Sequence, residues 1–109
     1  MIAVVCLSVL FGERVRADND WPITLNSAVS NILGGVSEQD KDWIRQTKYE
    51  DLIRYHHGWG TGIRNEFGLW RGNNELIISA CGKPCHPDSA SMRIIEAVWL
   101  ALQSQASGK

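Results

Sequence analysis

Apolar residues recur at steps of three and four in one short segment of this chain after another. Each segment follows a residue that can cap a helix, and each ends at glycine or at a polar stretch. A strand would instead alternate apolar and polar residues, and no hairpin turn of the Asn-Gly kind occurs. The sequence therefore predicts an all-α fold, a compact bundle of about five short helices.

The positions of the expected helices follow from their caps and stripes. The expected caps are Thr24, Ser37, Thr47, Asn73 or Asn74, and Asp88. The apolar stripes are Leu25, Ala28, Val29, Ile32 and Leu33; Trp43 and Ile44; Leu52, Ile53, His56, Ile63 and Phe67; Leu76, Ile77 and Ile78; and Met92, Ile95, Val98, Trp99 and Leu102. Because residues 47–50 match a capping box, the third helix is predicted to run unbroken from there to Gly68.

Residues 56–70 (HHGWGTGIRNEFGLW) contain four glycines, adjacent histidines and two tryptophans. A glycine inside a helix costs about 0.5–1 kcal/mol relative to alanine, so Gly58, Gly60 and Gly62 need a compensating contact. We interpret them as a flattened helix face against which another backbone or an indole ring packs, with a tryptophan as the expected guest. A phosphate-binding glycine loop would follow a strand, and no strand is predicted before residue 56.

The 109 residues have room for one domain. Residues 2–11 form an apolar run that is too short to cross a bilayer, which takes about 20 residues, but suits the core of a signal peptide. We predict a signal peptide over residues 1–17, a single helical domain over residues 18–103 and a frayed tail over residues 104–109. The mature protein is then periplasmic or secreted and has no membrane attachment. The alternative is that the first segment forms a buried strand or helix.

Two cysteines, Cys81 and Cys85, remain after the expected cleavage, and an oxidising compartment favours a disulfide between them. A disulfide closing so short a loop is expected to contribute about 2 kcal/mol. Because His86 follows directly, the stretch also resembles the haem-attachment motif C-x-x-C-H with one residue added, so a c-type haem is an alternative. Zinc bound by these three side chains with His56 or His57 is another, although the usual ligand spacing is missing. We expect the disulfide and no resident cofactor or metal.

Three polar residues near the middle of the chain invite interpretation. We interpret His56 as a half-buried ring whose nitrogens are satisfied by a carbonyl or a carboxylate. Arg64 and Asn65 lie beside the apolar stripe, where the guanidinium either bridges carbonyls at a neighbouring helix end, which we expect, or binds a carboxylate of a partner. A small hydrolase using a histidine stays an alternative, since serines and carboxylates are present but no nucleophile-elbow or metalloprotease spacing occurs.

From residue 21 to residue 102 the sequence resembles a bacterial family of domains of unknown function, number 6794. The resemblance rests on Trp21, Pro22, Leu25, Ala28, Val29, Asp51, Leu52, Ile53, His56, Gly58, Trp59, Gly60, Ile63, Arg64, Asn65, Phe67, Gly68, Leu69, Trp70, Asn73 or Asn74, Leu76, His86, Pro87, Asp88, Ser91, Ile95, Trp99 and Leu102. It implies a small helical bacterial domain and brings no assigned chemistry and no catalytic residue. His57, Cys81 and Cys85 depart from the pattern, so their roles rest on the chain's own residues.

The composition favours a non-enzymatic protein-binding module, either an accessory domain or an immunity-like protein, that is monomeric. The net charge is −1 and no basic cluster is present, so we expect no nucleic-acid partner. Aromatic and arginine side chains dominate the energetics of protein interfaces. We therefore expect whichever of Trp59, Trp70 and Arg71 are exposed to contact the partner.

Overall fold

The computed structural model describes residues 20–107. Its elements are α2 (Leu25–Gly35), α3 (Glu38–Gln46), the 3₁₀ helix η2 (Tyr49–Tyr55), α4 (Trp59–Glu66), α5 (Asn74–Cys81) and α6 (Pro87–Ser107). No strand occurs within this range, so the predicted all-α fold is confirmed. Among these helices none has both the length and the apolar character that crossing a membrane requires. The predicted signal peptide lies outside the described residues.

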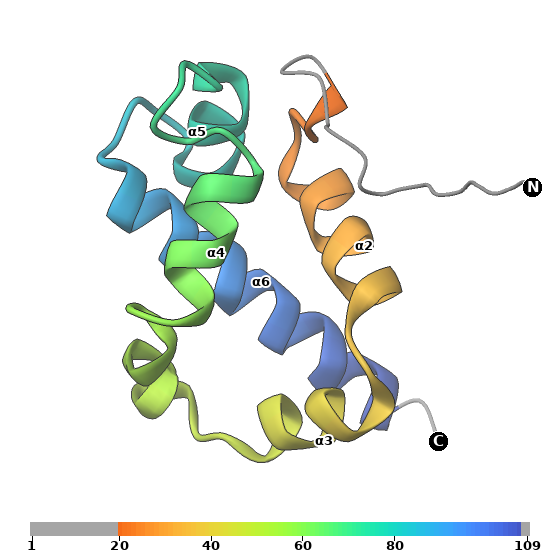
Figure 1. Ribbon diagram of the computed structural model, residues 1–109. Helices are drawn as coiled ribbons and strands as arrows, with labels where there is room; N and C mark the ends of the chain where they lie inside the picture. The colour runs from red at the N-terminus through yellow and green to blue at the C-terminus, as the bar shows by residue number, and fades with distance from the viewer. Residues whose placement is uncertain (1–19, 108–109) are drawn as a thin grey trace, which may run out of the picture.

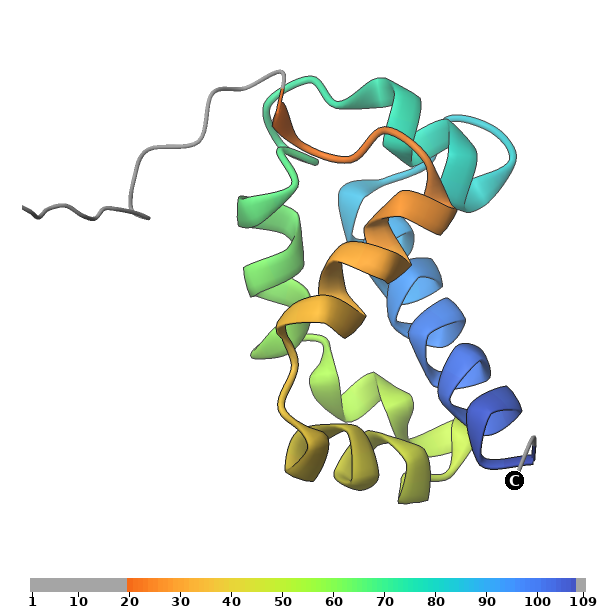
Figure 2. The ribbon, with the colours of Figure 1, turned by 90° about the vertical axis from the view of Figure 1, so that its right-hand side faces the viewer.

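Helix α6 is the longest element, and every other described helix packs against it. It runs along the molecule with α2 and α4 beside it, α5 near its beginning and α3 near its end (Figures 1 and 2). Ile94, Ile95, Val98 and Leu102 of α6 are completely buried. The predicted stripe of the last helix is thus confirmed, with Ile94 as an additional core residue. The core is therefore built around a single central helix.

The last helix extends beyond the predicted end of the domain at residue 103, because α6 continues as a helix to Ser107. The amide nitrogen of Gln103 donates to the backbone carbonyl of Arg45 at 2.9 Å. The guanidinium of Arg45 in turn donates to the backbone carbonyl of Leu102 at 3.3 Å. These reciprocal hydrogen bonds join the last turn of α3 to α6 near residue 103, and the helix beyond them takes in residues 104–107, which were predicted to fray.

The expected caps are correct at three helices. Thr24 accepts a hydrogen bond from Ser27 N, Ser37 accepts one from Asp40 N, and α2 and α3 begin there. Asn73, rather than its neighbour, caps α5 and accepts from the backbone N–H of Leu76 at 3.3 Å. The side chains thus supply acceptors for amide groups that the first turn of a helix leaves without partners.

The cap predicted at Asp88 is wrong, because α6 begins earlier, at Pro87. His86 precedes the helix, and its carbonyl accepts the first helical hydrogen bond from Ala90 N at 3.0 Å. The Nδ1 atom of His86 also accepts from Asp88 N at 3.0 Å. Proline suits the first helical position, since its fixed φ is helical and its missing N–H would have had no partner.

The third helix is shorter than predicted and is divided in two. Thr47 does not form a capping box: its hydroxyl donates to Trp43 O at 2.9 Å and closes α3. Its carbonyl accepts from the indole N–H of Trp99 at 2.8 Å, which ties this turn to α6. A 3₁₀ helix, η2, follows, and residues 56–58 form a turn before α4 begins at Trp59. Trp43, predicted to face inward, has 69% of its surface exposed, whereas Ile44 is buried.

The expected tryptophan does pack against a glycine, but at a different position. A Cβ on Gly68 would lie 1.9 Å from the Trp21 ring, whereas Cβ atoms on Gly58 and Gly62 would meet nothing within 4 Å. Gly60 approaches the guanidinium of Arg64 instead. The interpretation of Gly58, Gly60 and Gly62 as an indole seat is therefore wrong. The other expected guest, a neighbouring backbone, is found at Gly60 alone of the three, where a Cβ would lie 3.3 Å from the carbonyl of Tyr55. Gly68, with φ +70°, ends the helix as predicted, in a conformation that glycine adopts without steric cost.

Candidate functional site

Arg64 on α4 is 7% exposed and lies at the junction of three segments of the chain. Its Nη1 donates to Ser91 Oγ at 2.9 Å and to His56 Nδ1 at 3.5 Å. Its Nη2 donates to Thr61 Oγ1 at 2.9 Å and to the carbonyl of His56 at 3.3 Å. Its Nε lies 3.4 Å from Asp88 Oδ1. These five acceptors match the five N–H groups of a guanidinium, so the side chain has no donor left for a partner.

The arrangement around Arg64 agrees with the bridging role predicted for it. The carbonyl of His56 lies just past η2, while Ser91 and Asp88 lie in the first turns of α6. The guanidinium therefore joins the ends of two helices to the helix that carries it. The half-buried state expected for His56 is also correct, since 22% of its side chain is exposed. Its Nδ1 atom, however, faces the Arg64 guanidinium and not a carbonyl or carboxylate. Asn65, the neighbour of Arg64, is exposed, and its backbone carbonyl accepts from Arg71 at 3.4 Å.

A hollow of about 250 Å³ lies outside this cluster. It is lined by Ile53, His56, Asp88, Ser89, Met92, Arg93 and Glu96. A histidine and a carboxylate thus meet in a concavity, as a small hydrolase would require. The contacts of His56 do not favour a role in hydrolysis. The Nδ1 atom of His56 faces the Arg64 guanidinium at 3.5 Å, and its Nε2 atom lies 3.9 Å from Asp88 Oδ2, so both ring nitrogens face groups of the cluster itself.

The serine of this cluster also has hydrogen-bond partners within the cluster. Ser91 is completely buried, and its hydroxyl donates to the carbonyl of Asp88 at 2.9 Å while it accepts from Arg64. A nucleophilic serine needs a base to take its proton, and this proton is directed at a backbone carbonyl. The Nδ1 atom of His56 faces Arg64 and not the Ser91 hydroxyl, whose described partners are Arg64 and the Asp88 carbonyl. The cluster is therefore built to hold helices together.

Cys81 and Cys85 form the predicted disulfide, across the loop that joins α5 to α6. In this state both sulfur atoms are bonded to each other and not offered to a haem vinyl group or to zinc. His86, the residue that a haem would use, accepts from Asp88 N and packs edge-on against Trp70, with ring centroids 5.3 Å apart. Among the described residues no three His, Cys, Asp or Glu side chains are arranged to hold a metal ion.

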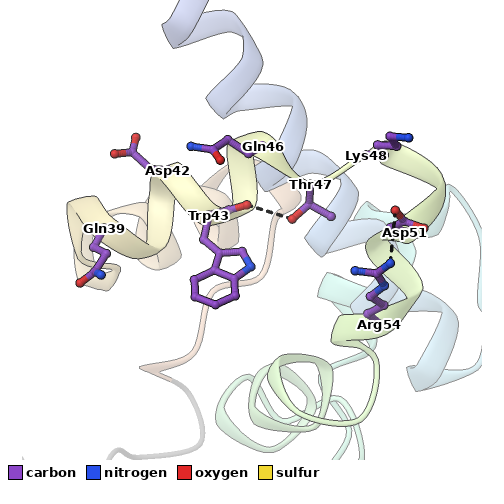
Figure 3. A pocket seen from close by; sticks show the side chains of 8 residues that line it. All are labelled: Gln39, Asp42, Trp43, Gln46, Thr47, Lys48, Asp51 and Arg54. Atoms are coloured by element: carbon purple, nitrogen blue, oxygen red, sulfur yellow. Dashed lines mark hydrogen bonds and ion pairs between the residues drawn. The ribbon is translucent and has the colours of Figure 1, made fainter.

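The most exposed of the large apolar side chains is Trp43, on α3. Its indole stands between two hollows. The polar hollow, of about 520 Å³, is lined by Gln39, Asp42, Trp43, Gln46, Thr47, Lys48, Asp51 and Arg54 (Figure 3). The apolar hollow, of about 350 Å³, is lined by Val36, Asp40, Trp43, Ile44, Tyr55 and Trp59. We call the indole with these two hollows the Trp43 surface.

The structure buries part of one of the three side chains that we expected at an interface and exposes the other two. Trp59 packs against the core, with its ring 5.5 Å from that of Tyr55, and contributes only one wall of the apolar hollow. Trp70 is 57% exposed, at the turn between α4 and α5. Arg71 is exposed and lies over the ring of Trp21, 5.4 Å from its centroid. Trp70 and Arg71 thus remain accessible, in the turn that leads into α5. Helix α5 lies at the opposite end of the molecule from α3 (Figure 1).

A family model described as "Domain of unknown function (DUF6794)" matches residues 21–102. The chain belongs to this family. The predicted resemblance is therefore confirmed over the range given for it. No curated protein and no solved structure matches the chain. The match to DUF6794 extends from the indole that covers Gly68 to the last fully buried residue of α6, Leu102, so it includes the whole core.

The sequence did not identify Trp43 as a surface residue of the DUF6794 domain. Helical spacing alone places it next to Ile44, and adjacent positions on a helix differ by about 100° in direction. The sequence Glu38 to Asp42 offered one signal, since four of its five residues are charged and the first turns of α3 are therefore mostly exposed. A helix this polar has room for only a narrow buried stripe, and Ile44 occupies it.

Proposed function

We propose that this DUF6794 domain works by binding another protein and that it does so through the Trp43 surface. The observation that carries the proposal is an indole with 69% of its surface in solvent, beside a largely apolar hollow. Burying a side chain of this size gives a large hydrophobic gain, and tryptophan is enriched among the residues that dominate binding energy. Nothing in the fold requires Trp43 to be apolar, because its neighbour Ile44 supplies the core contact of α3.

The shape of the surface favours Trp43 over Trp70 as the centre of an interface. Interface residues with large energetic effects lie in well-packed pockets from which water is excluded. Trp43 forms a wall of two hollows, so a partner side chain can be enclosed on either side of it. Trp70 already uses one side of its ring against His86. Trp70 therefore serves as a matched control: the same residue type, similarly exposed, at the other end of the molecule.

The domain acts as a monomeric accessory or immunity-like module in an oxidising compartment, periplasmic or extracellular. The disulfide between Cys81 and Cys85 supports this location, because disulfides persist in such compartments and are rare in the cytosol. Fractionation of source cells, with an alkylating agent added before lysis, tests it. Recovery of the protein in the cytosol with both thiols alkylated would contradict this location.

The binding proposal is tested with the wild-type chain and the variants Trp43→Ala and Trp70→Ala. Each is used as bait in source cells, and a retained protein is identified, purified and titrated against all three. We expect Trp43→Ala to weaken the dissociation constant at least about 30-fold, the effect of losing about 2 kcal/mol or more at a central interface residue. Trp70→Ala is expected to leave binding unchanged.

The controls separate loss of binding from loss of folding. Because Trp43 is mostly exposed, the free energy of unfolding of Trp43→Ala should lie within about 0.5 kcal/mol of that of the wild type. A partner that is lost with Trp70→Ala and kept with Trp43→Ala would overturn the choice of surface. A protein that yields no partner, or whose purified partner binds all three chains equally, would overturn the proposal itself.

A further inference from the structure

We infer the chemistry of the partner segment that the Trp43 surface accepts: a bulky apolar side chain with a Lys or Arg on one side of it and an Asp or Glu on the other. This inference rests on the proposed function and adds the identity of the charges. It follows from which charged side chains at the two hollows already have partners within the molecule and which do not.

The apolar hollow fixes the central side chain of the partner. Its walls include Val36, Ile44, Tyr55 and Trp59, and Trp43 lines both this hollow and the polar one. A space of about 350 Å³ with such walls fits a large apolar side chain. Most of the surface that an occupant would meet there is apolar, so an apolar side chain gains more from leaving water than a charged one does.

The apolar hollow carries one charged side chain, Asp40. Asp40 is exposed, and within the part of the chain that the structure describes its carboxylate has no hydrogen bond or ion pair. Lys41, next to it, is engaged with Glu38 at 3.1 Å. A cation of the partner beside the apolar side chain would therefore find an unpaired carboxylate at the edge of this hollow.

At the polar hollow the charge without a partner is positive. Asp51 forms an ion pair with Arg54 at 3.6 Å, and Asp42 forms one with Arg45. Lys48 lines the same hollow, and among residues 20–107 its ammonium group has no hydrogen bond or ion pair. The charges left for a partner are thus one negative, at the apolar hollow, and one positive, at the polar hollow, and Trp43 lines both hollows. Complementary charges at such positions select partners and fix how they lie, more than they add affinity.

The inference is tested with synthetic peptides and the intact chain. The probe is a short peptide whose central Leu-Phe-Leu is flanked by a Lys on one side and a Glu on the other. Two further peptides replace the Lys or the Glu by Gln. Each is titrated against the wild type, Asp40→Asn and Lys48→Gln, with Glu75→Gln on α5 as a control that removes one exposed charge far from the Trp43 surface.

The expected result is a specific pattern of pairwise losses. On the wild type, replacing the Lys or the Glu of the peptide should each weaken binding about two- to five-fold, the size expected for a partly exposed ion pair. Replacing the Lys of the peptide should no longer weaken its binding to Asp40→Asn, and replacing the Glu should no longer weaken its binding to Lys48→Gln. Glu75→Gln should behave like the wild type, and Trp43→Ala should abolish binding of every peptide.

The outcomes also separate this inference from the proposed function. Equal binding of all three peptides, with loss of each on Trp43→Ala, would overturn the inference and leave the proposed surface supported. Failure of every peptide to bind would overturn the inference too, while the titration of a purified partner would still decide the function. Charge effects that persist on both Asp40→Asn and Lys48→Gln would place the complementary charges elsewhere.

Discussion

Arg64→Ala is expected to destabilise the domain more than any other change of a charged residue that we consider. The substitution removes a guanidinium that satisfies five acceptors and is 7% exposed. A hydrogen bond to a charged group contributes about 1.5–3 kcal/mol, but the carboxylate of Asp88 is 45% exposed and regains water when the arginine is removed. Counting mainly the drier contacts to Ser91 and to the carbonyl of His56, we expect a loss of about 3 kcal/mol.

The assay is urea unfolding followed by circular dichroism, with the disulfide intact. With a slope of about 2 kcal/mol per molar urea, the midpoint should fall by about 1.5 M. Arg64→Lys keeps the charge but has at most three donors, so we expect its free energy of unfolding to be about 1–2 kcal/mol lower than that of the wild type. Arg93→Ala is the control, because Arg93 is 55% exposed and pairs only with Glu96, and we expect less than about 1 kcal/mol. An Arg64→Ala variant as stable as this control would refute the bridging role.

Three further expectations concern stability. Gly68→Ala should cost about 2 kcal/mol or more, because it combines a positive φ with a Cβ placed inside an indole ring, whereas Gly72→Ala, with φ +97° and open space, should cost about 1 kcal/mol; thermal unfolding compares them. Asn73→Asp keeps the helix cap but replaces a donor to two carbonyls, so chemical unfolding should show a loss of about 2 kcal/mol. Reduction of the Cys81–Cys85 disulfide should cost about 2 kcal/mol by urea unfolding, and an unchanged midpoint would contradict that.

The sequence predicted the local features of the fold well. Thr24 and Ser37 cap helices as expected, because capping depends only on a side-chain oxygen and amide groups two or three residues away. The stripe ending at Leu102 is buried because a helix that is apolar on one face has to cover that face. The disulfide could be predicted from the cysteine count and the short distance along the chain.

Two of the errors involve a contact with a residue distant in sequence. The capping box at residue 47 failed because the hydroxyl of Thr47 closes the preceding helix and its carbonyl accepts from Trp99, a residue 52 positions away. The seat for an indole lies at Gly68 because Trp21 approaches there from the start of the domain. No local pattern contains these pairings.

The candidate site was only partly within reach of the sequence. The role of Arg64 could be predicted, since an arginine beside an apolar stripe commonly satisfies helix-end carbonyls, but its five partners could not. The Trp43 surface could not be predicted either, because both of its hollows are lined by residues of α3 and of η2, and the apolar hollow also by Val36 and Trp59. The angle between those two elements depends on the break of the third helix, which the sequence pattern did not show.

The central position of α6 has a consequence for how the chain reaches its structure during synthesis. The other described helices precede α6 in the sequence, and each of them buries its apolar residues largely against it. Until α6 leaves the ribosome, the earlier helices share no common partner, and short helices on their own are unstable in water. The domain therefore folds only after translation has passed Leu102, and a nascent chain stalled earlier would offer its apolar stripes to chaperones instead.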